Sequence, residues 1–241
     1  MPGAENFEML SRLEPSTYGL AVPRSQAAQV YEVVRGDILS GRNTPGRKLK
    51  IQEIADQLGV SPGAVREALS RLVAEQLVVS RDQRGFVVAP LSIDDLEDLT
   101  DMRCEVEAIA LRRSAEHGDV EWEAGIIAAE HRLRATPIRE DGVLDAASPV
   151  WTAMHARFHA SLVAAAGSRR LLSLHSQLYE QSERYRGLSA HIESRRDVEG
   201  EHRRIAELAL ARDVEALIGA ATEHLRTTTR LIVDAARERR L

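Results

Sequence analysis

The sequence predicts a mainly α-helical protein in two parts, and three observations support this fold class. Residues that favour helices are abundant, whereas aromatic residues make up only 4% of the chain. At 241 residues the chain exceeds the usual size of one domain. Strand-like segments lie in the first 91 residues, and every periodic pattern beyond Ser92 is helical. We therefore expect an N-terminal arm at 1–23, a mixed α/β domain at 24–91 and an all-helical domain at 92–241.

The first domain begins with a helical pattern that ends at Ser40-Gly41. Two later signals are local and strong: Asn43-Thr44-Pro45-Gly46 is a turn, and Ser61-Pro62 starts a helix, with Ser61 as N-cap and Pro62 at the first helical position. In order, the patterns predict a helix over 25–39, a strand over 48–51, helices over 52–58 and 61–76, and strands over 77–80 and 85–89.

The second domain opens at Ser92, with Asp95 three residues on, which is typical of a capped helix start. A loop is expected over 137–149, and Gly167 ends the helix that follows it. The patterns predict helices over 92–117, 121–135, 150–166, 171–188, 197–211 and 213–237, which would form an antiparallel bundle.

Composition excludes several classes of protein. No apolar stretch is long enough to span a bilayer, no secretion signal is recognisable, and one cysteine, Cys104, cannot form an internal disulfide, so we expect a cytoplasmic protein without membrane contact. Cys104 is more simply a buried apolar residue than a reactive thiol. The net charge is −5, but residues 24–91 carry ten Lys/Arg against seven Asp/Glu, or +3, which leaves −8 elsewhere. Only the first domain therefore has the charge of a phosphate-binding module.

The segment from Ile54 to Leu69 has the features of a helix-turn-helix. Gly59 permits a tight turn, and Ser61 then caps a second helix whose exposed first turn can enter the major groove of DNA. Arg66, one turn into that helix, can reach a guanine edge or a phosphate. Arg71 further along is either a phosphate contact or part of a solvated face, and Arg84 with Arg81 can form a wing over the adjacent backbone.

These residues resemble the GntR family of bacterial regulators over roughly residues 25–91. The resemblance rests on Pro45-Gly46 before Leu49, Ser61 with Val65-Arg66-Glu67-Ala68-Leu69, Arg71-Leu72, and Arg84-Gly85 before Val87. It implies a winged helix-turn-helix that contacts an operator in double-stranded DNA through Ser61, Arg66 and Gly85.

The chain departs from this family pattern at two places. Pro62-Gly63-Ala64 stands where Arg-Thr-Pro is common, so a base-reading guanidinium is missing and the operator sequence cannot be taken from relatives. Gln52 stands where some members have Arg, and it can hydrogen-bond but carries no charge. Winged helices also serve as protein-binding modules, which is the competing interpretation.

All eight histidines lie in the second domain, and four of them stand out. His155 and His159 are four residues apart on one helix, whereas His202 and His224 lie on two later helices. A bundle can bring three such helices to one interior point, and converging imidazoles suit Zn, Ni or Cu. Spacing alone leaves open that these are surface residues or hydrogen-bonded core histidines.

The second domain resembles the FCD domain of the FadR-like GntR subfamily. The residues that carry the resemblance are Arg103 with Glu107, Phe158-His159, Glu201-His202-Arg203-Arg204-Ile205 and Glu223-His224-Leu225. It implies a divalent metal held by His155, His159, His202 and His224, with His155 replacing the Asp of metal-binding members. A neutral ligand makes the site one unit more positive and softer, which favours Zn, or Ni, over Mn. Alternatively, His155 turns away and three histidines hold a metal with open positions.

Arg103 has two interpretations. It lies four residues before Glu107, so an ion pair within the helix would explain it. The FCD resemblance instead implies that Arg103 lies in the cavity, where its planar guanidinium can bind a carboxylate. A metal and an arginine in one cavity indicate a small organic acid as effector.

The sequence thus predicts a ligand-responsive DNA-binding transcription regulator rather than an enzyme. We expect a homodimer on a palindromic operator, acting as a repressor that ligand releases, although the residues equally allow activation. Two rivals are a metal-dependent hydrolytic enzyme built on the bundle, and a helical scaffold whose winged module binds protein.

Overall fold

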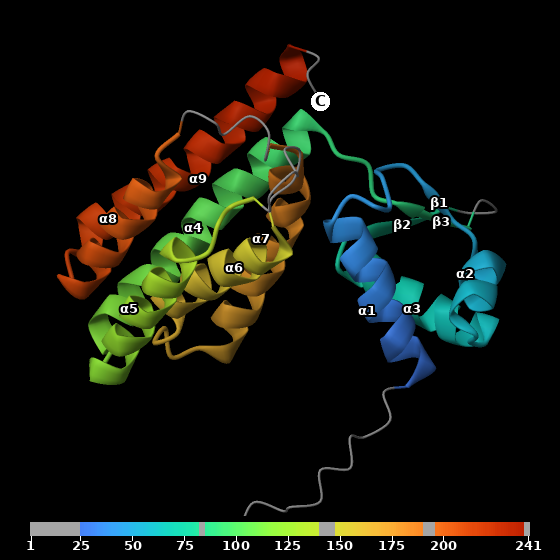
Figure 1. The fold of residues 1–241 in the computed structure, drawn as a ribbon, viewed down its shortest axis with the longest axis horizontal. Helices are drawn as coiled ribbons and strands as arrows, with labels where there is room; N and C mark the ends of the chain where they lie inside the picture. The colour runs from blue at the N-terminus through green and yellow to red at the C-terminus, as the bar shows by residue number, and fades with distance from the viewer. Residues whose placement is uncertain (1–24, 82–84, 140–147, 190–195, 239–241) are drawn as a thin grey trace, which may run out of the picture.

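The computed structural model describes residues 25–81, 85–139, 148–189 and 196–238 (Figure 1). The predicted arm at 1–23 and the wing residue Arg84 lie outside the described residues. The predicted fold class is confirmed: a small winged helix-turn-helix precedes an all-helical bundle.

In its described residues, the winged part contains three helices and a three-stranded antiparallel sheet of order β1-β3-β2. Val65, Leu69 and Leu72 of α3 are fully buried in its core, against α1 and the sheet. The elements are α1 (Gln26–Leu39), β1 (Lys48–Leu49), α2 (Ile51–Leu58), α3 (Pro62–Ala74), β2 (Val78–Arg81) and β3 (Gly85–Val88).

Local sequence signals explain how α2 and α3 are oriented. Gly59 adopts a left-handed backbone with φ of 64°, which ends α2, and the Ser61 side chain accepts a hydrogen bond from the Ala64 N–H to start α3. The expected strand over 48–51 is shorter than predicted, because Lys50 is the extended N-cap of α2 and Ile51 already belongs to that helix.

The bundle packs α4 along both α7 and α9, and α5 against α6 and α8 (Figure 1). Phe158, Ile126 and Leu217 are buried at its centre. No helix among the described residues is long and apolar enough to cross a membrane. The elements are α4 (Ile93–His117), α5 (Val120–Arg134), α6 (Pro149–Val163), α7 (Arg169–Ser189), α8 (Val198–Leu210) and α9 (Val214–Arg237).

The turn between α4 and α5 gives a test of this packing. A Cβ atom on Gly118 would lie 2.2 Å from Cε3 of Trp122, whose indole is buried, and 2.7 Å from the Ser114 carbonyl oxygen. We expect Gly118→Ala to lower the free energy of unfolding of the bundle by about 1–3 kcal/mol, because the backbone or the indole must move. Urea titration followed by tryptophan fluorescence measures this change, since both tryptophans of the chain, Trp122 and Trp151, lie in the bundle.

Gly125→Ala is the matched control for Gly118→Ala. Gly125 lies inside α5, and nothing lies within 4 Å of an added Cβ atom. This substitution should raise the free energy of unfolding by roughly 0.5–1 kcal/mol through helix propensity. Equal stabilities for the two variants would contradict the packing described here.

Candidate functional site

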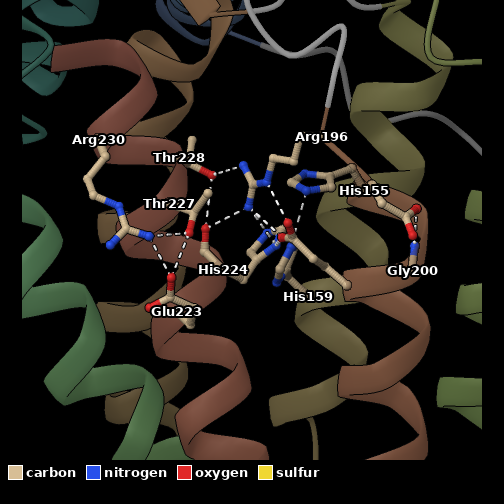
Figure 2. A network of polar contacts seen from close by, with 11 residues as sticks. His155, His159, Arg196, Gly200, Glu223, His224, Thr227, Thr228 and Arg230 are labelled. Carbon is tan, nitrogen blue, oxygen red and sulfur yellow. Dashed lines mark hydrogen bonds and ion pairs between the residues drawn. The ribbon is translucent and has the colours of Figure 1, made fainter. Parts of the chain in front are cut away.

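Four histidines from three helices converge inside the bundle. His155 and His159 come from α6, His202 from α8 and His224 from α9, and each offers a ligand nitrogen within 4.8 Å of the others. All four side chains are buried. Figure 2 shows that His155, His159 and His224 gather in one interior region between their helices.

Hydrogen bonds to the outer ring nitrogens orient two of these imidazoles. Nδ1 of His224 lies 2.7 Å from the Glu201 carboxylate, and Nδ1 of His155 lies 2.8 Å from the Tyr179 hydroxyl. With Nδ1 engaged, the Nε2 atom of each ring is left for the interior of the cluster. Metal-ligating histidines commonly have such a partner on the other nitrogen.

Arg196 supports this arrangement from the residues just before α8. Its guanidinium donates two hydrogen bonds to Glu201, at 2.7 and 2.6 Å, and one to the backbone carbonyl of His224 (Figure 2). Burial would raise the pKa of Glu201, but the hydrogen bonds from His224 and Arg196 outweigh it and hold the pKa at about 2. Glu201 is therefore a fixed anion beside the cluster.

One ring nitrogen of the cluster has no hydrogen-bond partner within the described part of the chain, and two others have only each other. His202 Nε2 is buried and makes no hydrogen bond to any described residue, which costs about 1–3 kcal/mol. Nε2 of His159 lies 3.2 Å from Nε2 of His155, so these two rings can share at most one proton. Burial, reinforced by the neighbouring histidines, lowers the pKa of His155, His159 and His202 well below 6.5. Four neutral imidazoles whose ring nitrogens lie within 4.8 Å of one another are a donor set that Zn accepts, so the residues fit such an ion.

A cavity adjoins the histidine cluster and carries cationic side chains. Arg103 donates a hydrogen bond to the Ser182 hydroxyl at 2.7 Å, and its guanidinium carbon lies 5.2 Å from the centre of the Tyr179 ring. Glu107, its alternative partner, instead lies 2.7 Å from Nε2 of His175 on α7. The lining includes Arg103, Arg186, Arg196, His155, His159, His224, Thr100, Ser182 and Thr228.

Sequence reasoning missed Tyr179, Arg186 and Arg196 in this cavity. Tyr179, Ser182 and Arg186 are spaced i, i+3, i+7 along α7, which places them on one helix face. That spacing is too common to identify a site by itself. Arg196 precedes α8 and has no periodic signal at all.

The predicted DNA-contacting residues lie on the winged part. Ser61 and Arg66 are exposed at the start of α3, as is Gly63. Gln52 donates a hydrogen bond to Asp56 at 2.9 Å, and Gly85 begins β3 with φ of 77°. Arg71 is exposed near the end of α3. Its guanidinium carbon lies 4.1 Å from the centre of the Tyr31 ring. The first turn of α3 is therefore open to a DNA groove.

An exposed recognition helix joined to a bundle with a buried polar cavity defines a class of protein, the bacterial transcription regulator with an effector domain. The chain matches the bacterial regulatory proteins of the gntR family over residues 26–88 and the FCD domain over residues 98–227. It belongs to the GntR family and carries an FCD domain, in the FadR-like architecture. The chain is therefore a DNA-binding transcriptional regulator, in a family of regulators rather than enzymes.

Two relatives and one solved structure illustrate this membership. The HTH-type transcriptional regulator BphR of Paraburkholderia xenovorans is 37% identical over 91% of this chain and 90% of its own length. The HTH-type transcriptional repressor GlaR of Escherichia coli is 32% identical over 85% of this chain and 94% of its own. The structure of McbR/YncC of E. coli has a TM-score of 0.69 at 19% identity, covering 88% of this chain and 99% of that one, and it shows the fold alone.

Proposed function

We propose that this protein is a metal-containing repressor that a small carboxylate releases from its operator. Residues 24–91 form the DNA-binding domain and residues 92–241 form the effector domain. The observation that carries the proposal is the buried set of four histidines beside a cavity that Arg103 lines; Nε2 of His202 has no hydrogen-bond partner among the described residues. The name of the E. coli relative, a repressor, supports the sign of regulation.

The operator would be read by the first turn of α3. Ser61 and the N–H groups of that turn suit a phosphate, and Arg66 suits a guanine edge or a phosphate. Gly63 and Ala64 bring only a backbone and a methyl group to the groove, so Arg66 would supply much of the base discrimination. Arg71 and Gln52, with Gly85 and Arg84 of the wing, would contact the flanking backbone. In a homodimer, two such winged helix-turn-helix domains would contact the two halves of a palindromic operator.

The metal would be held by His155, His159, His202 and His224, with Zn preferred over Ni. A bound Zn ion would supply a Lewis-acidic position to a carboxylate oxygen. The protein side chains do the rest: Glu201 and Tyr179 fix the orientation of two imidazoles. Arg103 would bind a second oxygen of the carboxylate through its planar guanidinium.

A single experiment tests this function directly. Fragments of genomic DNA that the purified full-length protein retains would be sequenced. The metal content of the same protein would be measured by elemental analysis. We expect a shared palindromic site, binding that weakens steeply as salt rises, and close to one Zn per chain. Protein that neither contains nor takes up Zn would overturn the metal centre. Affinity for DNA that does not respond to salt would overturn the operator-binding mode.

The identity of residue 155 should set the metal preference. Introducing the carboxylate that the FCD resemblance implies at this position, with His155→Asp, adds one negative charge and a harder ligand, so the affinity for Mn²⁺ should rise relative to that for Zn²⁺. Competition titrations of the two metals against a chelator measure this ratio. His117→Asp, on the end of α4 and away from the cluster, is the control and should leave the ratio unchanged. An unchanged ratio in His155→Asp would show that His155 is not a ligand.

A further inference from the structure

Helix α7 has two faces with different partners. Tyr179, Ser182 and Arg186 line the cavity beside the histidine cluster. The two residues between Tyr179 and Ser182 contact the winged part: Glu180 bonds to α1, and Gln181 bonds to the end of α3. Figure 1 shows α7 and α1 on facing sides of the two parts. The same turns of α7 thus contact both functional regions.

Gln181 provides a cap for the recognition helix. Its Nε2 atom donates a hydrogen bond to the backbone carbonyl of Glu75 at 3.2 Å, and Glu75 is the C-cap residue of α3. The last carbonyl groups of a helix have no partner within the helix, so a donor from another element fixes the position of that end. Gln76, the next residue, has a left-handed backbone with φ of 61°. The C-terminal end of α3 is therefore held by the effector bundle.

Arg35 of α1 lies between two carboxylates, one from each part of the protein. Its Nη2 atom lies 2.5 Å from Oε2 of Glu180, whereas its Nε atom lies 3.8 Å from Oε2 of Glu75. Both the Nε atom and that Glu75 oxygen are buried and make no hydrogen bond within the described part of the chain. Shortening this long ion-pair contact from 3.8 Å to about 2.9 Å would add a hydrogen bond to it.

The other Glu75 oxygen connects this ion pair to the DNA-facing side chains. Tyr31 donates a hydrogen bond to Oε1 of Glu75 at 2.8 Å, and the Tyr31 ring lies against Arg71 of α3. Burial, together with this bond to Glu75, raises the pKa of Tyr31 to about 12, so the phenol stays protonated and keeps donating. Displacing Glu75 would therefore disturb Tyr31 and, through it, Arg71.

We propose that Arg35 and Gln181 are positioning residues that make the orientation of α3 depend on that of α7. In the arrangement described here, Arg35 is bonded to Glu180 and Gln181 caps α3. A movement of α7 caused by a carboxylate bound in the cavity would release Glu180 and let Arg35 shorten its 3.8 Å contact with Glu75 to a hydrogen bond. This pair of alternative contacts is the two-state element that coupling between the two sites requires. The inference rests on the proposed function, because only a regulator needs such coupling.

Glu180→Gln in the full-length protein tests this inference, since it removes the charge and keeps the shape. The affinity for the wild-type-selected DNA fragment would be measured with excess Zn²⁺ and after chelation. We expect Zn²⁺ to tighten wild-type binding by roughly 5–150-fold, the usual range of coupling, because ordering α6, α8 and α9 fixes Tyr179 and hence α7. Glu180→Gln should shrink that ratio at least about threefold, with unchanged Zn content. Glu180→Asp should retain part of it.

Glu215→Gln is the matched control, because it breaks an exposed ion pair with Arg112 that lies within the bundle. The ratio of its DNA affinities with Zn²⁺ and after chelation should equal that of the wild type. Hydrogen exchange of the amides over 71–77 gives a second readout that needs neither DNA nor metal, and it should be faster in Glu180→Gln than in Glu215→Gln. The positioning role would be overturned if Glu180→Gln showed the same hydrogen-exchange rates over 71–77 as the wild type and the same ratio of DNA affinities with and without Zn²⁺. Failure of the wild type to bind Zn²⁺ or DNA would overturn the proposed function, while the exchange comparison would still decide the role of Glu180.

Discussion

Removing the metal with a chelator is expected to make the stability of the bundle fall steeply below pH 6.5. Burial lowers the pKa of His155, His159 and His202 in the folded protein, whereas each would titrate near 6.5 when unfolded. Below pH 6.5 the unfolded chain therefore binds more protons than the folded chain, and acid favours unfolding. The free energy of unfolding should therefore be greatest above pH 6.5. It should decline as the pH falls from there towards the lowered pKa values of the histidines in the folded protein.

The size of this effect follows from the number of protons taken up. Each histidine that protonates only on unfolding contributes about 1.4 kcal/mol per pH unit, so three contribute about 4 kcal/mol per unit. Urea titrations of chelated protein between pH 5 and 7.5, followed by tryptophan fluorescence, would measure the slope. His202→Ala should reduce the slope by about one third. A free energy of unfolding that does not change with pH would contradict the description of these imidazoles as buried and neutral.

The parts of the structure that local chemistry determines could be predicted from the sequence. Gly59, Ser61 and Pro62 act within a few residues of themselves, and the helix that they start is observed where it was expected. The i, i+4 spacing likewise placed His155 and His159 on one face of a helix. For the helices and strands themselves, local patterns misjudged the ends: α6 stops at Val163 rather than at 166, because the turn that Gly167 completes begins earlier.

The convergence of His202 and His224 with the α6 pair could not be derived from spacing. It depends on how three helices pack, and only the family resemblance indicated it. Tyr179 and Arg196 were missed for the same reason, since their role is defined by His155 and Glu201 on other elements. Local spacing even suggested a partner for Arg103 that does not bond to it.

Glu107 shows why that suggestion differed from the structure. Packing of α7 against α4 brings His175 to 2.7 Å from the Glu107 carboxylate, a contact between residues 68 positions apart. Burial would raise the pKa of Glu107, but the hydrogen bond from His175 lowers it, so the carboxylate is ionised and already paired. Arg103 then bonds to Ser182 and lines the cavity, where we propose that it binds the carboxylate of the effector.

Arg66→Ala is expected to weaken binding to the selected DNA fragment by roughly 5–150-fold, equivalent to about 1–3 kcal/mol for one lost base or phosphate contact. The effect should lie near the upper end, because Pro62, Gly63 and Ala64 supply no other cation in the first turn of α3. Electrophoretic mobility shifts at two salt concentrations separate the two kinds of contact. Loss of a base contact relaxes the sequence preference of binding. Loss of a phosphate contact instead lowers the salt dependence of the affinity by about one counterion.

Glu67→Ala, on the neighbouring exposed position of α3, is the control for general damage to the helix. Removing a negative charge from a surface that faces phosphates should leave affinity equal or increase it. Zn content should be unchanged in both variants, because α3 makes no contact with the histidine cluster among the described residues. If Arg66→Ala bound the fragment as tightly as the wild type, α3 would not present this guanidinium to DNA. The reading surface would then have to be sought in the wing.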